Sequence, residues 1–184
     1  FSDIVRKSPA DIINVSIDDK NIAVITSGDS TFNIIGINAD EFPEIPSVNQ
    51  ENSKLIIPGE ILRSMIRQTI FAVAVQDIKP VHKGIKFEVE NNNLRLISCD
   101  GFRLAIRNEP IEYAGDDMTF VVPAKTLSEV VKLADDDETN ITFSIGKKFI
   151  LFEIGNYRII SRLLEGEFFN YKNAIPSEST TKAR

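Results

Sequence analysis

Two pairs of basic residues give this sequence its clearest candidates for binding chemistry. Arg63 and Arg67 lie four residues apart, and Lys125 and Lys132 lie seven apart. On an α-helix either spacing places both side chains on one face, although Glu129 could neutralise part of the field of the two lysines. Such a face can hold a phosphate backbone through charge alone, without reading bases. The alternative interpretation is that these residues are ordinary solvated positions.

A catalytic or metal-binding centre is not predicted. His82 is the only histidine, and no motif supplies partners for it. Cys99 ends an alternating stretch beside a turn, where a small half-buried residue is expected rather than a reactive thiol. The acidic run 135–138 lacks the ligand spacing of a calcium loop and is expected to be a solvated loop. The sequence therefore predicts a protein that is not an enzyme and has no cofactor and no metal.

Composition and charge limit the classes of protein to consider. The chain has 184 residues, of which 42% are hydrophobic, so a globular protein is expected. No apolar run approaches the roughly 18 residues of a membrane helix. The net charge of −6 means that any contact with nucleic acid must be local. A single cysteine and the absence of an initiating Met or a leader favour a cytosolic piece of a longer protein.

An internal repeat organises most of the chain. One copy begins at 55–58 and continues into a helical period over 60–75, and a second begins at 120–123 with a helical stripe from Leu127 to Ala134. Three alternating stretches, typical of half-buried antiparallel strands, follow each helix. They cover 85–90, 94–99 and 102–107 in the first copy, and 141–145, 149–154 and 157–164 in the second. Each copy is therefore predicted to be a β-α-β-β-β unit.

The end of a third copy, without its helix, is expected near the N-terminus. Alternating stretches at 13–17, 22–27 and 30–37 repeat the strand pattern. Because the copies occur in pairs, each pair is expected to form a domain. The predicted divisions are the C-terminal part of a truncated domain at 1–48, a complete domain at 54–176, and a linker toward a missing domain at 177–184.

The break at Asp100-Gly101 is a further candidate for binding. Asp-Gly between alternating stretches predicts a two-residue hairpin with a type I′ turn. Phe102 and Leu104 would then share one face of the sheet beside the turn. That arrangement could leave apolar surface available to a partner.

Four segments resemble, in order, segments of bacterial beta sliding clamps, the beta subunits of DNA polymerase III. Residues 66–74 resemble "IxQTxFAVS", 97–105 resemble "ATDGxRLA", and 41–46 and 165–171 resemble the exits of the first and middle clamp domains, the latter written "xGxFPDY". Cys99 replaces the usual Thr and Phe169 the usual Pro. The resemblance implies an α+β DNA-clamp fold, with two β-α-β-β-β units per domain, antiparallel sheets outside and two helices on the inner face.

The resemblance also implies a function. Clamps of this family are rings of two chains with three domains each, which encircle duplex DNA in the bacterial cytoplasm. They raise the processivity of the replicative polymerase holoenzyme in DNA replication but catalyse nothing. The implied partners are duplex DNA, the polymerase catalytic subunit, the clamp loader and repair polymerases. The full-length protein is expected to form a homodimer, and this piece a monomer. The alternative is a peptide-binding interaction module with no role on DNA.

Two sets of site residues follow from the resemblance. The residues expected to face DNA are Arg63, Arg67, Gln76, Lys79, Lys83, Lys125 and Lys132. One half of a pocket for short linear motifs of partner proteins is expected from His82, Cys99, Gly101, Phe102, Arg103, Leu104 and Pro176. The other half belongs to a last domain that this chain lacks, so peptide binding by this piece alone is expected to be weak or absent.

Overall fold

The computed structural model describes residues 1–8, 10–42, 54–76, 79–134 and 139–176. The chain divides into two compact units, Phe1–Ile45 and Pro46–Arg184. No helix in the described ranges is both long and apolar enough to cross a membrane.

The smaller unit is a short helix followed by a three-stranded antiparallel meander. Its elements are α1 (Ser2–Arg6), β1 (Asn14–Ile17), β2 (Ile22–Ser27), β3 (Ser30–Ile35) and the 3-10 helix η1 (Ala39–Glu41). The strands pair in sequence order, β1-β2-β3. They lie where the alternating stretches predict them, and α1 is a helix that the sequence did not predict.

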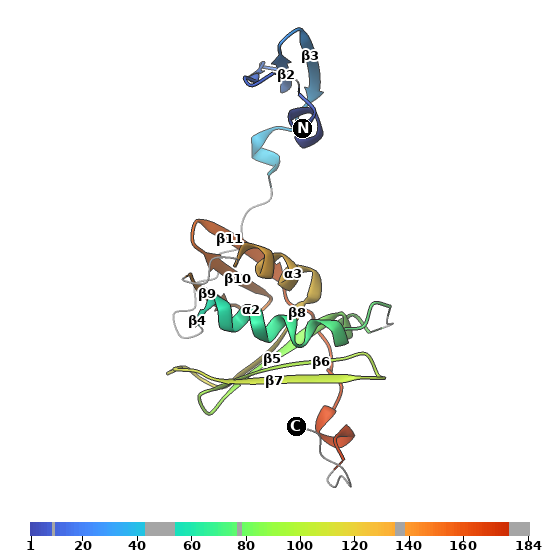
Figure 1. Ribbon diagram of the computed structural model, residues 1–184, viewed down its shortest axis with the longest axis vertical. Coiled ribbons are helices and arrows are strands. Elements are labelled where there is room, and N and C mark those ends of the chain that lie inside the picture. Colours follow the sequence, from blue (N-terminus) through green and yellow to red (C-terminus); the bar gives the residue numbers. More distant parts are fainter. Residues whose placement is uncertain (9, 43–53, 77–78, 135–138, 177–184) are drawn as a thin grey trace. The chain divides into compact units, whose positions relative to one another are not determined.

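The described residues of the larger unit form two four-stranded antiparallel sheets, two α-helices and short 3-10 helices (Figure 1). Its elements are β4 (Lys54–Pro58), α2 (Gly59–Arg67), η3 (Ile70–Ala72), η4 (Pro80–Lys83), β5 (Gly84–Glu90), β6 (Asn93–Cys99), β7 (Leu104–Pro110), β8 (Met118–Pro123), α3 (Ala124–Leu133), β9 (Asn140–Ile145), β10 (Phe149–Ile154), β11 (Tyr157–Arg162) and η5 (Tyr171–Ala174). The β-α-β-β-β order of both copies and the α+β class are confirmed.

The two copies exchange their first strands. The sheets have the orders β11-β10-β9-β4 and β7-β6-β5-β8, so β4 of the first copy pairs with β9 of the second. Strand β8 of the second copy pairs in turn with β5 of the first. Neither copy can therefore complete a sheet alone, and the pair is one folding unit.

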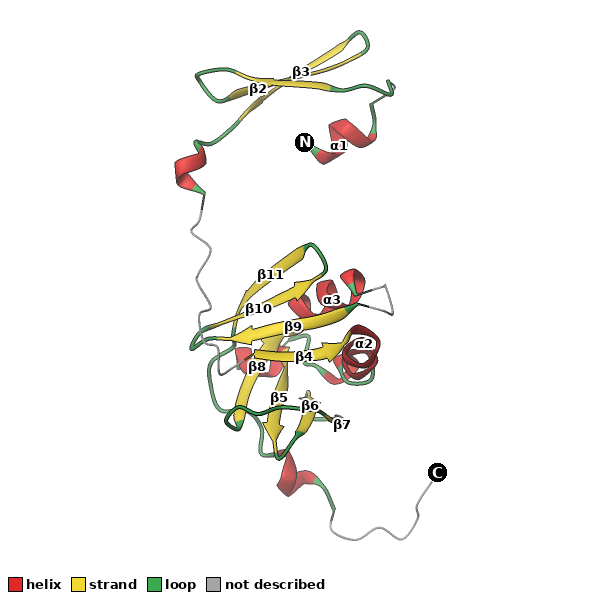
Figure 2. Ribbon diagram, turned by 90° about the vertical axis from the view of Figure 1, so that its left-hand side faces the viewer, coloured by secondary structure: helices red, strands yellow, loops and turns green. Residues whose placement is uncertain are grey.

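One hydrophobic core lies between the sheets and the helices. Helix α2 packs on β4 and β9, α3 packs on β5, β8 and β11, and the two helices contact each other. Figure 2 shows them lying together beside the strands. The ring of Phe87 stacks on Phe120 at 5.2 Å and meets Phe143 edge-on at 6.2 Å, and Phe143 lies 5.7 Å from Phe152. Because Phe87 and Phe143 belong to different sheets, their contact joins the two halves of the core.

Helix α2 ends earlier than the sequence predicts. The apolar period continues to residue 75, but the helix stops at Arg67 and the 3-10 helix η3 follows. The hydroxyl of buried Thr69 donates to the carbonyl oxygens of Met65 (2.8 Å) and Ile66 (3.2 Å). The carbonyl of Thr69 itself accepts a hydrogen bond from the Ser98 hydroxyl on β6. The Thr69 hydroxyl thus satisfies two carbonyl groups at the end of the helix in place of backbone N–H groups, and the chain turns there.

The prediction for Asp100-Gly101 is wrong in its turn type. A four-residue loop, 100–103, joins β6 to β7, and within it only Gly101 has a positive φ, of 88°. One carboxylate oxygen of Asp100 accepts from the backbone N–H groups of Phe102 (3.0 Å) and Arg103 (3.1 Å). These bonds stabilise a wider loop than a two-residue turn. Phe102 therefore lies in the loop. The expectation that Phe102 and Leu104 share one face of the sheet is wrong.

Candidate functional site

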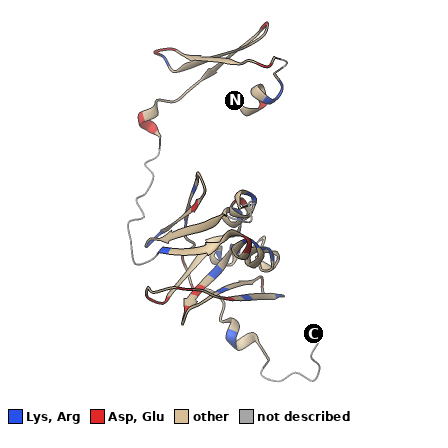
Figure 3. Cartoon of the chain, turned by 60° about the vertical axis from the view of Figure 1, so that its left-hand side comes forward, with Lys and Arg blue, Asp and Glu red and all other residues tan. Residues whose placement is uncertain are grey.

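The exposed faces of α2 and α3 carry three of the predicted DNA-facing cations. Arg67 lies in the last turn of α2, and Lys125 and Lys132 lie on α3, all exposed to solvent. Lys132 forms an ion pair of 2.8 Å with Glu129, as the sequence indicated it could. Figure 3 shows Lys and Arg positions on both helices. Since the helices contact each other, their cations can act on one extended ligand.

Arg63 has a different environment from the other cations of the helices. Its side chain is half-buried, and Nη1 donates a 3.1 Å hydrogen bond to the carbonyl oxygen of Ala134. Ala134 is the C-cap of α3, where carbonyl groups lack helix partners and a positive charge is favoured by the helix dipole. Arg63 therefore ties α2 to the end of α3, a structural role that helical spacing alone did not indicate.

The loop before β5 presents the remaining predicted DNA-facing residues. Gln76, Lys79 and Lys83 are all exposed, on either side of residues 77–78, which lie outside the described ranges. The backbone N–H of His82 donates to the carbonyl of Lys79 at 3.1 Å, which helps to shape η4. These three polar side chains are close together in the sequence, and the structure exposes all three at the surface.

Loop 100–103 carries three of the predicted half-pocket residues, Gly101, Phe102 and Arg103. Phe102 is 100% exposed, an unusual environment for a large aromatic ring. Arg103 is held by Asp100 at 2.9 Å and lies over the ring of Phe71, 5.8 Å from its centroid. Leu104 is partly buried. Phe71 is itself 56% exposed, and sequence reasoning missed it as part of this surface.

Cys99 and Gly101 shape the base of this loop. Cys99 is buried, more so than the sequence predicted, and its Sγ accepts from the N–H of Gly101 at 3.4 Å. A Cβ added to Gly101 would meet nothing within 4 Å, so the positive φ and not crowding favours glycine there.

The last two predicted pocket residues lie on other segments. His82, in η4, is half-buried and meets the ring of Phe168 edge-on, with 5.9 Å between the centroids. Pro176 is exposed and is the last residue that the structure describes. Both belong to the larger unit, as loop 100–103 does.

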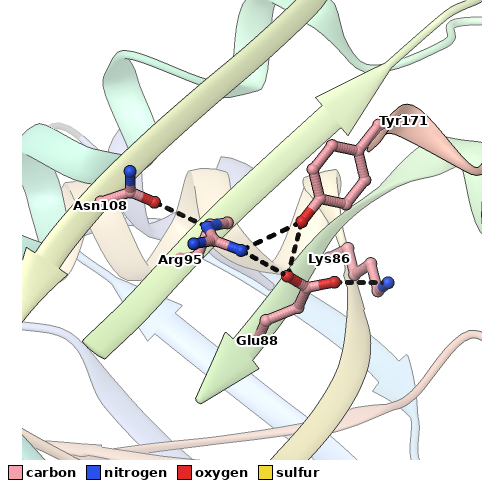
Figure 4. Close-up of polar contacts among 5 residues, drawn as sticks. All are labelled: Lys86, Glu88, Arg95, Asn108 and Tyr171. Carbon is pink, nitrogen blue, oxygen red and sulfur yellow. Dashed lines mark hydrogen bonds and ion pairs between the residues drawn. The ribbon is translucent and has the colours of Figure 1, made fainter. Parts of the chain in front are cut away.

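A polar cluster outside the predicted site connects two distant parts of the chain (Figure 4). The Tyr171 hydroxyl donates to Oε2 of Glu88 at 2.7 Å and accepts from Nη1 of Arg95 at 3.2 Å. Arg95 and Lys86 both form ion pairs with Glu88, at 3.3 Å and 2.7 Å. Nε of Arg95 donates to Asn108 at 2.8 Å. These bonds hold η5 against the sheet β7-β6-β5-β8, through residues on β5, β6 and β7.

The protonation states of the cluster favour these bonds. Burial alone would raise the pKa of Glu88, but hydrogen bonds from Lys86 and Tyr171 and the charges of Lys86 and Arg95 outweigh it, so that this pKa is lowered. Burial, followed by the hydrogen bond to Glu88, raises the pKa of Tyr171. The hydrogen bond with Tyr171 raises the pKa of Arg95. Near neutral pH the cluster therefore joins a carboxylate, two cations and a neutral phenol.

The lowered pKa of Glu88 predicts a pH-dependent contribution to stability. Its pKa is below the ordinary 4.5 in the folded state, so the ionised group stabilises the fold above that pH. The contribution is lost as the pH falls through the lowered pKa. In urea unfolding followed by circular dichroism, Glu88→Gln is expected to lose about 1–2 kcal/mol at pH 7. Below about pH 4 its curve should approach that of the wild type.

Glu90→Gln is the matched control for this experiment, because Glu90 is exposed at the end of the same strand. It is expected to follow the wild-type pH profile. Parallel profiles of Glu88→Gln and the wild type would contradict the assignment of the lowered pKa to Glu88.

The described residues contain no group of three or more His, Cys, Asp or Glu side chains that could hold a metal ion. The acidic run 135–138, expected to be a solvated loop, lies outside these residues.

Family comparisons match nearly the whole chain. Residues 49–170 match the family model of the DNA polymerase III beta subunit, central domain. Residues 1–46 match the model of the DNA polymerase III beta subunit, N-terminal domain.

Individual relatives agree with the family models. The beta sliding clamp of Halalkalibacterium halodurans is 38% identical over 98% of this chain and 48% of its own length, and that of Bacillus subtilis is 33% identical over 99% and 48%. The crystal structure of the Bacillus subtilis sliding clamp matches 97% of this chain and 47% of its own, with a TM-score of 0.87 and 32% identity. A beta subunit from Eubacterium rectale gives 0.84 and 36%, over 97% and 49%. The chain spans about half the length of these relatives.

Proposed function

Because the chain belongs to the DNA polymerase III beta subunit family, we propose that it contributes the middle domain, and the end of the first, to a ring that encircles DNA. The solved relatives confirm the clamp fold that the sequence predicted. In this proposal residues 1–48 complete the first domain, 54–176 form the middle domain, and 177–184 lead to the last. The full-length protein is a homodimeric processivity factor of the bacterial cytoplasm that tethers the replicative polymerase and catalyses no reaction.

The observation that carries this proposal is the pair of contacting helices with exposed cations on a chain of net charge −6. Arg67, Lys125 and Lys132 attract phosphates without reading base edges, because no base-specific geometry is needed for charge attraction. The acidic remainder of the chain repels DNA. Such a distribution of charge favours contact with the duplex on the helix side and permits movement along it.

The exposed loop 100–103 supports a second part of the proposal, the binding of partner proteins through short linear motifs. Phe102 and Phe71 offer apolar surface, and Arg103 lies between Asp100 and Phe71. Apolar side chains of an extended peptide can fill such a surface. The polymerase catalytic subunit, the clamp loader and repair polymerases are the proposed sources of these motifs.

A circular DNA substrate tests the proposed ring. Full-length protein assembled on nicked circular duplex by the clamp loader and ATP is expected to stay with the DNA through gel filtration at about 0.5 M salt. High salt removes proteins held by phosphate contacts alone, whereas a closed ring is held by topology. Cutting the circle with a restriction enzyme should release the protein.

The same experiment addresses the alternative of a peptide-binding module with no role on DNA. That alternative predicts no comigration with the circle before or after cutting. Retention that persists after linearisation would contradict the ring and indicate ordinary binding.

A further inference from the structure

The sheet β11-β10-β9-β4 has a partly apolar face on the side away from the helices. Along β10, Ile150, Phe152 and Ile154 are buried in the core that α2 and α3 cover. Phe149 and Leu151 alternate with them, so their side chains lie on the opposite face, which we call the outer face. Neither belongs to that core, and both are partly exposed.

A row of side chains crosses the outer face. Leu151 pairs with Ile160 on β11 and with Ser144 on β9, and Ser144 pairs with Lys54 on β4. Residues that pair across neighbouring strands share one face of a sheet. Ile160 is partly exposed, and Phe149 lies two residues from Leu151 along β10. Phe149, Leu151 and Ile160 therefore form one apolar area, which we call the outer patch.

The internal repeat shows that the equivalent row of the other sheet is polar. The repeat makes Leu55 equivalent to Phe120, and these residues pair with Phe143 and Phe87. The equivalent rows are therefore Ile160, Leu151 and Ser144 in one sheet and Asn108, Arg95 and Glu88 in the other. The polar row is bonded to Tyr171 of the same chain (Figure 4). The outer patch has apolar side chains at two of these three positions, so it suits an apolar ligand instead.

Exposed cations gather at one end of the outer patch. Arg162 on β11 pairs with Phe149. The turn between β9 and β10 carries Lys147 and Lys148, and the carbonyl of Lys148 accepts from the N–H of Leu163 at 2.8 Å. We call Lys147, Lys148 and Arg162 the end cations. All three are exposed, and within the part of the chain that the structure describes none of them forms an ion pair.

The remaining charge of the outer face is balanced or negative. Arg158 forms an ion pair of 3.3 Å with Glu153 in the row beyond Leu151. On the β4 side, a cavity of about 670 Å³ lies between Ile56 and residues 112–116, which include two acidic side chains. Unpaired positive charge is therefore concentrated at the end of the patch that the end cations occupy.

The outer face is directed away from the proposed DNA-facing helices. Ser161 faces α3, because its hydroxyl lies 2.8 Å from that of Thr126. Arg162 is the next residue of β11, so its side chain is directed to the outer face. A duplex held on the helix side is therefore not expected to contact Arg162, whose charge is available to another ligand.

We propose that the outer patch and the end cations form a docking surface for an extended segment of a second protein, one that carries both acidic and apolar side chains. Its apolar side chains pack on the outer patch, and its carboxylates pair with the end cations. Charge complementarity selects this occupant, because the unpaired charges beside the patch are all positive. The surface is separate from loop 100–103 and goes beyond the proposed function.

Methyl NMR of the full-length protein locates the binding of defined probes. The probes are two synthetic peptides of about ten residues, a length that an extended segment needs to cross a sheet of this size. Both have Leu and Phe in the C-terminal half, whereas the N-terminal half consists of Asp and Glu in one and of Lys and Arg in the other. The acidic peptide is expected to shift the methyl signals of Leu151 and Ile160. The basic peptide should leave them unchanged, and Ile25, buried in the smaller unit, is the reference.

Reversing the charge of the turn tests the end cations. Lys147→Glu with Lys148→Glu is expected to weaken binding of the acidic peptide about tenfold at about 50 mM salt. The effect should be smaller at about 0.5 M salt, because salt screens attraction between exposed charges. An unchanged affinity at low salt would overturn the role of the cations and with it the choice of an acidic occupant.

A second pair of substitutions tests the outer patch. Leu151→Thr with Ile160→Thr keeps residues that favour strands and is expected to weaken the acidic peptide about tenfold at either salt concentration. Tyr157→Thr is the matched control, since Tyr157 is an exposed side chain of β11 that pairs with Ile154 on the core side. It should bind the peptide like the wild type. Equal affinity of all three proteins would overturn the patch.

Other results would assign the surface differently and overturn the proposal. Equal responses of Leu151 and Ile160 to both peptides, or none to either, would exclude an acidic segment. A shift confined to Leu104 would place the peptide at the proposed partner site beside loop 100–103. Shifts that depend on protein concentration without peptide would indicate a second copy, and a stronger response to oligothymidylate would indicate nucleic acid. The experiment on circular DNA is independent of all these results, so failure of the ring would leave this test intact.

Discussion

Replacing Arg67 and Lys125 by glutamate in the full-length protein is expected to weaken its attraction to duplex DNA and to reduce the dependence of binding on salt. Both residues are exposed, one on each of two contacting helices. A plot of log K, the binding constant for DNA, against log [salt] has a negative slope. Each phosphate contact that is lost should make this slope less steep by about 0.9. Sedimentation or anisotropy with a linear duplex between about 50 and 200 mM salt measures this slope.

The choice of these two positions follows from their surroundings. Arg63 bonds to the end of α3, so a charge reversal there would also disturb the fold. Lys132 is already paired with Glu129. Lys147→Glu with Lys148→Glu makes the same change of charge in an exposed turn between β9 and β10, away from the helices. This control should retain the wild-type slope. Equal slopes for all three proteins would show that the helix faces do not contact phosphates.

The strands were predictable from the sequence because alternation reports directly which residues face a core. The repeat added their order, and the strands of both copies lie within a few residues of where the pattern places them. The exchange of β4 and β8 was not predictable. A period of two residues indicates that a strand has a buried face, but it does not identify the neighbouring strand.

The turns also show that a local sequence pattern does not fix the conformation. Asp100-Gly101 has the composition of a type I′ turn, yet that conformation occurs at Asn91-Asn92, with φ of 51° and 56°. Asparagine adopts positive φ more often than most residues other than glycine, so Asn91-Asn92 and Asp100-Gly101 both have the composition of a tight turn. At Asp100-Gly101 the Asp100 side chain accepts hydrogen bonds from two backbone N–H groups, and these bonds stabilise the wider loop.

Spacing and composition indicated the helix cations and the Asp100-Gly101 segment, the resemblance added the other site residues, and the supporting contacts came only from the structure. Arg63 and Ala134 are 71 residues apart, and Glu88 and Tyr171 are 83 apart. Helical or strand spacing relates residues within one element, so it cannot indicate such pairs. The single signal for the segment that carries Tyr171 was its three aromatic residues, Phe168, Phe169 and Tyr171, which sequence reasoning assigned only to a domain exit.

Phe143→Ala is expected to destabilise both sheets of the larger unit together. Phe143 is fully buried on β9, is paired with Leu55 of the exchanged strand β4, and contacts Phe152 on β10 and Phe87 on β5. Removing its ring leaves a cavity where the two halves of the core meet, at a cost of about 3–5 kcal/mol. Since domains are commonly stable by only about 5–15 kcal/mol, this is a large fraction of the total.

Hydrogen exchange can show whether the sheets respond as one unit. Because each sheet takes a strand from the other copy, opening one should open the other, and the most protected amides of β5 and β9 should accelerate by the same factor. Phe102→Ala removes an identical ring from a fully exposed position and should change stability by less than about 0.5 kcal/mol. Acceleration confined to β9 in Phe143→Ala would mean that the sheets unfold separately. The exchanged strands would then not couple the two copies.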